Sequence, residues 1–191
     1  MLYNIVLFVH ILGAVLMFIA MGILFTAMIS MLHAKEKDEV HKWSALAVKL
    51  DGLMPLSTLL IIAPALYLVF SAWGWGVAWI NVSLALFVVM SVMGPMINLR
   101  RLKSIMDAAS SETGTVPSAA LLSKVRDRAL WNSVSVMSML TVGILFLMAV
   151  KLPLLGSLAT IGFAVIAGFV LANVLLAKFK TADTPNPAMP G

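Results

Sequence analysis

Four long stretches of this sequence contain no Asp, Glu, Lys or Arg: residues 2–32, 52–99, 129–150 and 152–177. A transmembrane helix needs about 20 apolar residues to cross a hydrocarbon core of about 30 Å, and every stretch reaches that length. The second stretch is long enough for two crossings and is interrupted by Trp73-Gly74-Trp75-Gly76. The sequence therefore predicts an all-α, polytopic membrane helical bundle. Its five transmembrane helices are expected over about 4–32, 52–72, 77–98, 129–150 and 154–177.

The composition agrees with this fold class. Hydrophobic residues make up 62% of the chain and charged residues 11%, which is more apolar surface than a soluble domain of this length could bury. The chain has no cysteine, which excludes disulfides, thiolate metal ligands and thiol nucleophiles. Because the basic residues sit in loops between apolar runs, the net charge of +5 indicates contact with the lipid bilayer and no nucleic-acid partner.

The basic residues are divided unequally between the two sides of the expected membrane. Threading the five spans places Lys151 on one side and the other twelve Lys and Arg residues on the opposite side. Short loops rich in Lys and Arg stay in the cytoplasm, so we expect the N-terminus outside and the C-terminus inside a bacterial inner membrane. Residues 1–180 are expected to form one membrane domain and residues 181–191 a disordered cytoplasmic tail.

Local patterns refine the expected helices. Apolar residues at helical spacing over 40–50 predict an amphipathic lead-in to the second span that lies near the inner headgroups. The third helix is expected to continue to about Ala109, and Pro117 to open a helix that runs unbroken to Val150. Prolines within the second and third spans predict kinks; they are Pro55, Pro64 and Pro95.

The fifth span carries a small residue at every fourth position. Small side chains let helix backbones approach closely, and in lipid such contact drives helix association. The pattern predicts a packing face, either within the bundle or toward a second protomer or another membrane subunit. The residues of this face are Gly156, Thr160, Ala164, Gly168 and Ala172.

His10 is the one ionisable side chain inside an expected span, which makes it a functional hypothesis. Desolvation favours its neutral imidazole, which could ligate haem iron or copper, or donate a hydrogen bond to another helix. A haem on His10 would want a second axial ligand. Methionines within the spans are candidates, namely Met93, Met137, Met139 and Met148. The carboxylates of haem favour basic partners, and only Lys151 is expected on the same side as His10.

A second group of polar residues is expected near the inner membrane surface. Asp51 begins the second span, and Arg128, Asn132 and Ser135 follow one stripe of the fourth helix. They could form an inward-facing polar pocket in which Arg128 pairs with Asp51 or meets an anion. Alternatively, Asn132 and Ser135 hold helices together while Arg128 anchors to headgroups.

Three short runs carry a resemblance to a known group of proteins. These runs are Val9-His10-Ile11-Leu12-Gly13-Ala14, Asp51-Gly52-Leu53-Met54-Pro55-Leu56, and the fourth helix from Arg128 to Ala149-Val150-Lys151-Leu152-Pro153. The chain resembles the predicted integral membrane proteins of the domain-of-unknown-function 2269 family. More distantly it is similar to HemJ-type protoporphyrinogen oxidases and copper-resistance D-type membrane proteins. In the HemJ family a first-helix histidine is associated with haem, and the resemblance assigns that position to His10.

The sequence contains no catalytic constellation that we recognise. No nucleophile–base pair, phosphate-binding glycine loop or paired carboxylate falls within a span, so we expect neither catalytic residues nor a dedicated metal site. The first interpretation is a structural or accessory membrane subunit held to its partners by the fifth helix. The alternatives are a b-type haem protein that uses His10, and a small transporter or metal-handling protein.

Overall fold

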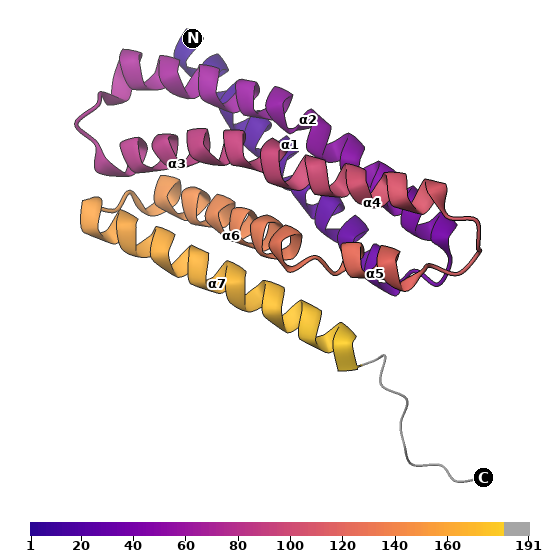
Figure 1. Cartoon of the computed structure of the whole chain (residues 1–191). Coiled ribbons are helices and arrows are strands. Elements are labelled where there is room, and N and C mark those ends of the chain that lie inside the picture. Colours follow the sequence, from indigo (N-terminus) through magenta and orange to yellow (C-terminus); the bar gives the residue numbers. More distant parts are fainter. Residues whose placement is uncertain (182–191) are drawn as a thin grey trace.

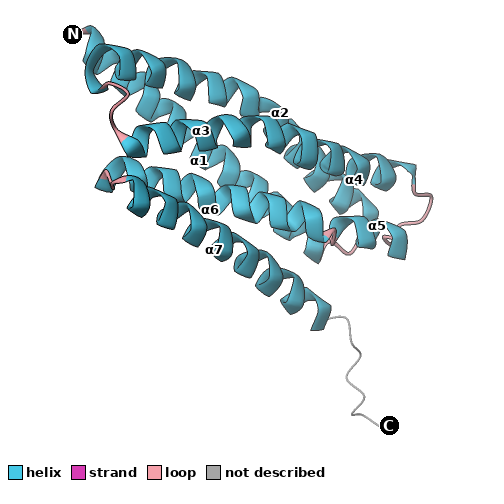
Figure 2. Cartoon of the chain, turned by 60° about the vertical axis from the view of Figure 1, so that its left-hand side comes forward, coloured by secondary structure: helices cyan, strands magenta, loops and turns pink. Residues whose placement is uncertain are grey.

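The computed structural model describes residues 1–181, and this part of the chain is a helical bundle without strands (Figures 1 and 2). The elements in chain order are α1 (Leu2–His33), α2 (Lys37–Leu68), the π-helical turn η1 (Val69–Trp73), α3 (Ala78–Gly94), the π-helical turn η2 (Pro95–Leu99), α4 (Arg100–Ser111), α5 (Ala119–Val125), α6 (Arg128–Val150) and α7 (Leu154–Thr181).

Five helical units of the described chain are long and apolar enough to cross a membrane. They cover residues 2–33, 37–73, 78–111, 119–150 and 154–179. The prediction of an all-α chain with five such helices is therefore confirmed. The predicted disordered tail lies outside the described residues except for Thr181, which ends α7.

The helices run alternately up and down, so the bundle has two distinct ends. Helix α1 packs along α2 and helix α6 along α7, and the α3–α4 unit lies between these two pairs (Figure 1). The Trp end holds Met1, the turn between η1 and α3 with its tryptophans, and the turn at Lys151. The basic end holds α4, α5 and the turns on either side of them, with twelve of the thirteen Lys and Arg residues.

The most extensive apolar core of the described chain lies toward the basic end. It joins side chains of α1, α2, α4, α5, α6 and α7, with Trp131 and Leu102 fully buried. Trp131 packs edge-on against Phe25 at a ring separation of 6.1 Å, and its Nε1 donates a hydrogen bond of 2.9 Å to the Val125 carbonyl. This cluster closes the bundle at the basic end.

The segment 40–50 does not form a separate surface helix. It is the first part of α2, and Val40 and Ala47 are fully buried against the protein. Since α2 packs along α4 over this region, another helix covers the apolar face that was predicted to rest on lipid headgroups. The segment thus leads into the second span as predicted, but Val40 and Ala47 of its apolar face contact the protein.

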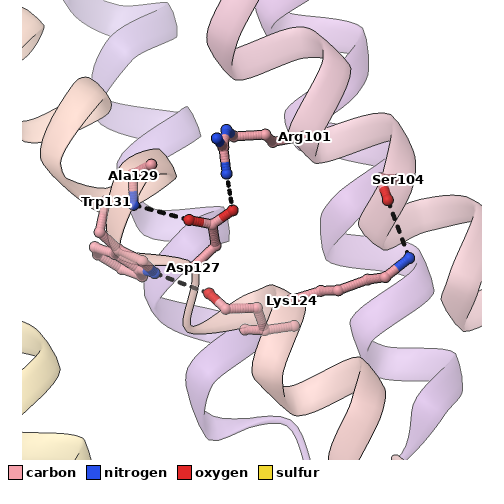
Figure 3. A network of polar contacts seen from close by, with 7 residues as sticks. Arg101, Ser104, Lys124, Asp127, Ala129 and Trp131 are labelled. Carbon is pink, nitrogen blue, oxygen red and sulfur yellow. Dashed lines mark hydrogen bonds and ion pairs between the residues drawn. The ribbon is translucent and has the colours of Figure 1, made fainter.

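The predicted unbroken helix from Pro117 to Val150 is also wrong, because the chain breaks between α5 and α6. Asp127 has non-helical backbone angles and caps α6 by accepting a hydrogen bond of 2.8 Å from the Ala129 amide. The same carboxylate forms an ion pair with Arg101 of α4. Lys124 of α5 donates a hydrogen bond to Ser104 of α4, so both sides of the break are tied to one helix (Figure 3).

The third helix continues beyond the expected span, as predicted. Helix α3, η2 and α4 follow one another without a loop from Ala78 to Ser111. Pro95 opens the π-helical turn η2, because proline cannot donate the usual backbone hydrogen bond. The helical register therefore changes where the sequence predicted a kink.

Candidate functional site

His10 of α1 is buried against α2 in the half of the bundle nearer the Trp end. Its ring is 5% exposed, and Nδ1 lies 3.0 Å from the carbonyl oxygen of Ile61. A carbonyl can only accept, so Nδ1 is the donor, and in the neutral imidazole Nε2 keeps its lone pair. Histidines that ligate metals usually donate their other ring N–H in this way, which fixes the tautomer and the ring orientation.

The close approach of α1 to α2 at this point has a local cause in both helices. A Cβ on Gly13 would lie 3.0 Å from both the Leu60 oxygen and the Ile61 Cγ1. Pro64 has no N–H to donate to the Leu60 carbonyl, four residues earlier. Glycine on one helix and proline on the other therefore bring His10 within reach of the α2 backbone.

A groove of about 1080 Å³ opens beside His10. Helix α1 forms one wall and the last turns of α6 form the other, while the start of α3 and the end of η1 close its floor. Most of its lining is apolar. The lining also includes Tyr3, His10, Trp73, Met148 and Lys151. A smaller cavity of about 60 Å³ continues behind the same histidine toward the bundle interior.

Aromatic side chains organise the Trp end of this groove. Trp73 Nε1 donates a hydrogen bond of 3.3 Å to the Tyr3 hydroxyl, and Trp73 packs against Trp79 at a ring separation of 5.9 Å. Lys151 lines the groove as well. Lys151, the one basic residue that the sequence placed on the same side as His10, thus shares its groove.

The structure separates the four methionines considered as second ligands. Met148 lines the groove together with His10. Met137 lines a different cavity, described below, and Met93 is 46% exposed on the bundle surface. The partly buried Met139 lines neither space. Position within a span could not distinguish these side chains, because the distinction depends on which helix face meets the groove.

The other two histidines lie at the basic end. His33 Nδ1 lies 3.0 Å from the Ile29 carbonyl and its ring packs against Phe179, whereas His41 Nδ1 lies 3.3 Å from the Met106 carbonyl. Neither lines the groove. Within residues 1–181 no three His, Asp or Glu side chains gather in a way that could hold a metal ion.

A second space, the inner cavity, is lined by residues of α1, α2, α3, η2 and α6. It measures about 90 Å³, and its buried polar lining includes Asp51, Asn98 and Ser138. Of the four residues predicted to form a polar pocket, only Asp51 lines this cavity. Arg128 is exposed, and within the described chain no ion pair joins it to Asp51.

Within the predicted stripe on α6, Ser135 belongs instead to the contact with α7. A Cβ on Gly168 would lie 3.0 Å from the Ser135 carbonyl oxygen, and one on Gly143 would lie 3.4 Å from Ala164. Ser135 is thus buried on the α7 side, and Asn132 is half-buried. Sequence reasoning missed Asn98 and Ser138; the only signal for Asn98 was a polar residue three positions after Gly94-Pro95.

The small-residue face of α7 packs within the bundle. Thr160, Ala164 and Gly168 meet α6, and Ala172 is fully buried in the core at the basic end. Gly156 contacts Leu152 in the preceding turn. Of the two alternatives left open by the sequence, the structure shows the intramolecular one, so a partner subunit would have to use another surface.

Comparison of the chain with known protein families, curated proteins and solved structures gives no match to any of them. The resemblances drawn from short runs of the sequence therefore stay predictions, and the function rests on the site itself.

Proposed function

We propose that this chain is a multi-pass protein of the bacterial inner membrane that binds haem b in the groove beside His10. Its Trp end faces outward and its basic end the cytoplasm. The orientation is supported by the division of basic residues, because positively charged short loops are retained in the cytoplasm. Trp75, 46% exposed at the other end, suits the opposite interface, where its amphipathic ring favours the headgroup level.

The observation that carries the haem proposal is the hydrogen bond from His10 Nδ1 to the Ile61 carbonyl. It leaves Nε2 as a neutral nitrogen donor on a side chain that lines the groove. The groove volume, about 1080 Å³, is close to the upper end of the ~300–1,000 Å³ range of cofactor sites. Its mostly apolar walls suit a flat, largely hydrophobic ring.

Two further residues of the groove fit the same group. Met148, on the α6 wall, lines the same groove as His10 and would supply a thioether, and His/Met ligation is an established way to hold haem iron. Lys151 supplies a cation for the carboxylates that haem carries at its edge. Haem held in this way would supply one-electron transfer, at a potential raised by the methionine ligand.

The chain's own residues would have three tasks in such a site. The contact of Gly13 with α2 holds His10 at the Ile61 carbonyl, so the ring has one tautomer before any ligand arrives. The hydrogen bond from Trp73 to Tyr3 would hold two aromatic side chains in place at the Trp end of the groove. Lys151, exposed at the same end, would attract an anionic group.

The absorption spectrum of the purified protein tests this proposal. We expect a Soret band after expression with a haem precursor, its loss in His10→Ala, and its retention in the control His33→Ala. Met148→Leu should keep the band and shift its position, because only the second axial ligand changes. A protein that stays colourless after haem is added, or a band that survives in His10→Ala, would refute the proposal.

The accessory-subunit interpretation has less support. Its predicted docking surface was the small-residue face of α7, which α6 covers. A second subunit that co-purifies with the protein would revive that interpretation through a surface of different composition.

A further inference from the structure

The inner cavity is unusual because three of its buried polar side chains have an oxygen without a partner. Asp51, Asn98 and Ser138 are 4%, 4% and 6% exposed. Within the described residues, Asp51 Oδ2, Asn98 Oδ1 and Ser138 Oγ have no hydrogen-bond partner. An unsatisfied buried polar atom costs about 1–3 kcal/mol, and an unpaired charge costs more. Three such atoms around one space indicate that something polar fills it.

The amide of Asn98 has a defined role in this arrangement. Its Nδ2 donates to the sulfur of Met137 at 3.5 Å, so the amide oxygen is the atom left over for the cavity. Carboxylate and amide oxygens can only accept, and the serine hydroxyl can accept as well. The missing partner must therefore supply positive charge or hydrogen-bond donors.

Two prolines add backbone oxygens to the same space. Pro55 and Pro95 both line the cavity, and neither can donate to the carbonyl four residues before it. Those carbonyls belong to Asp51 and Ser91, which are also lining residues. Interrupted helices with freed carbonyls are the usual way in which membrane proteins coordinate small cations in the midst of apolar helices.

We infer that the inner cavity is a binding site for a small monovalent cation of the Na⁺ type, coordinated by Asp51, Asn98 and Ser138. The ligands are hard oxygens, which select hard cations. Asp51 is the one acidic group among the described residues that line the cavity, so a single positive charge neutralises the site and a divalent ion would not be matched. The volume of about 90 Å³ holds an ion with one or two waters, since a water occupies about 30 Å³.

The methionines around the cavity do not change this assignment. Met17, Met21, Met54 and Met90 line it beside Met137. Thioethers are common fillers of irregular cores and are weak partners for hard cations. They form an apolar surround of low dielectric constant, which strengthens the attraction between a cation and the few oxygens inside it.

The cation site is independent of the haem groove. The inner cavity and the groove share no lining residue, so substitution of a ligand in one space removes no lining residue of the other. The two proposals can therefore fail separately, and each is measured by a different signal.

Sodium-dependent stability of the full-length protein in lipid nanodiscs tests the inference. Thermal unfolding is followed by tryptophan fluorescence while sodium chloride replaces choline chloride at constant ionic strength, with potassium chloride as a parallel series. A ligand that binds only the folded state raises the unfolding midpoint with its concentration. We expect sodium to raise the midpoint of the wild type and of the control Asp107→Asn, whose side chain is exposed on α4.

Asp51→Asn keeps the size of the side chain and removes its charge. We expect its apparent sodium affinity to fall at least about tenfold, the factor that corresponds to about 1.4 kcal/mol. Without sodium the variant should be no less stable than the wild type, because it no longer buries an unpaired charge. If the variant does not fold, Ser138→Ala serves instead, since it removes a single oxygen and should lower the affinity by a smaller factor.

Three results would overturn the inference. One is an unfolding midpoint of the wild type that is the same in choline, potassium and sodium chloride. Another is a sodium response that persists unchanged in Asp51→Asn and Ser138→Ala. The third is stabilisation by acidification with no response to sodium, which would assign the cavity to a proton on Asp51 and not to a metal cation.

Discussion

The glycines of α7 offer the sharpest test of the packing. Gly168 and Gly162 lie on the same helix, but a Cβ on Gly168 would collide with the backbone of Val136, whereas one on Gly162 would meet nothing within 4 Å. The substitutions Gly168→Ala and Gly162→Ala thus add the same methyl group to a contact face and to an open face. The difference between the free energies of unfolding of the two variants isolates the contact between α6 and α7.

The magnitude follows from two opposing effects. Replacing glycine by alanine within a helix gains up to about 1 kcal/mol from backbone entropy, and this gain is common to both variants. At Gly168 the new Cβ would lie 2.8 Å from the Val136 nitrogen, well inside the ~3.5–4.0 Å separation of a favourable contact. Overpacking of this kind costs about 1–3 kcal/mol. Gly168→Ala should therefore be less stable than Gly162→Ala by about 1–3 kcal/mol.

Reversible unfolding of the purified protein in mixed micelles of rising denaturing-detergent fraction gives this free-energy difference. The oligomeric state of both variants is recorded alongside, because a face used between protomers would change the assembly first. Equal stabilities of the two variants would refute the packing of α7 on α6. So would a Gly168→Ala protein that dissociates from an oligomer while its fold keeps full stability.

The remaining predictions concern α1, the basic end and the orientation. Gly13→Ala should lower the free energy of unfolding by about 1–3 kcal/mol, because the added methyl group forces α1 away from α2. Gly22→Ala, in open space, should not lower it in the same unfolding assay. Equal effects of the two substitutions would contradict the close approach of α1 to α2. Asp127→Ala should lower the free energy of unfolding by about 1 kcal/mol through loss of the α6 cap. The ion pair with Arg101 should add little, because the two side chains are 40% and 29% exposed. An unchanged free energy of unfolding would contradict the capping role. Since the chain has no cysteine, Lys151→Cys should react with a membrane-impermeant maleimide on whole cells and Lys103→Cys only after permeabilisation; the reverse pattern would refute the orientation.

The sequence predicted what depends on composition and local spacing. Five apolar runs of spanning length specify five helices, whatever their mutual arrangement. The four-residue spacing from Thr160 to Ala172 predicts a packing face, because small residues repeated along one side of a helix let another helix backbone approach closely. His10 was identified for a similarly local reason, since it is the one ionisable group within a span.

The composition of the two cavities could not be predicted, because it depends on helix rotation and on contacts between distant segments. Arg128 and Ser135 follow one stripe in the sequence, yet Ser135 is buried next to Gly168 of α7 while Arg128 is exposed. Asn98 reaches the inner cavity from the π-helical turn at Pro95, which displaces every later side chain of that helix. The pairing of Gly13 with α2 requires a partner 47 or more residues away.

The length of α2 has a consequence for how this protein would denature. At 32 residues the helix measures about 48 Å, which exceeds a hydrocarbon core of about 30 Å. In the proposed membrane orientation its first turns would stand in water. There α2 packs with α4 around a core that includes Val40 and Leu102. That core is held by the hydrophobic effect, whereas lipid-embedded helices are held by close packing alone. Urea should therefore loosen the protruding part first, and harsh detergents the spanning part, so the order in which one bundle comes apart depends on the solvent that attacks it.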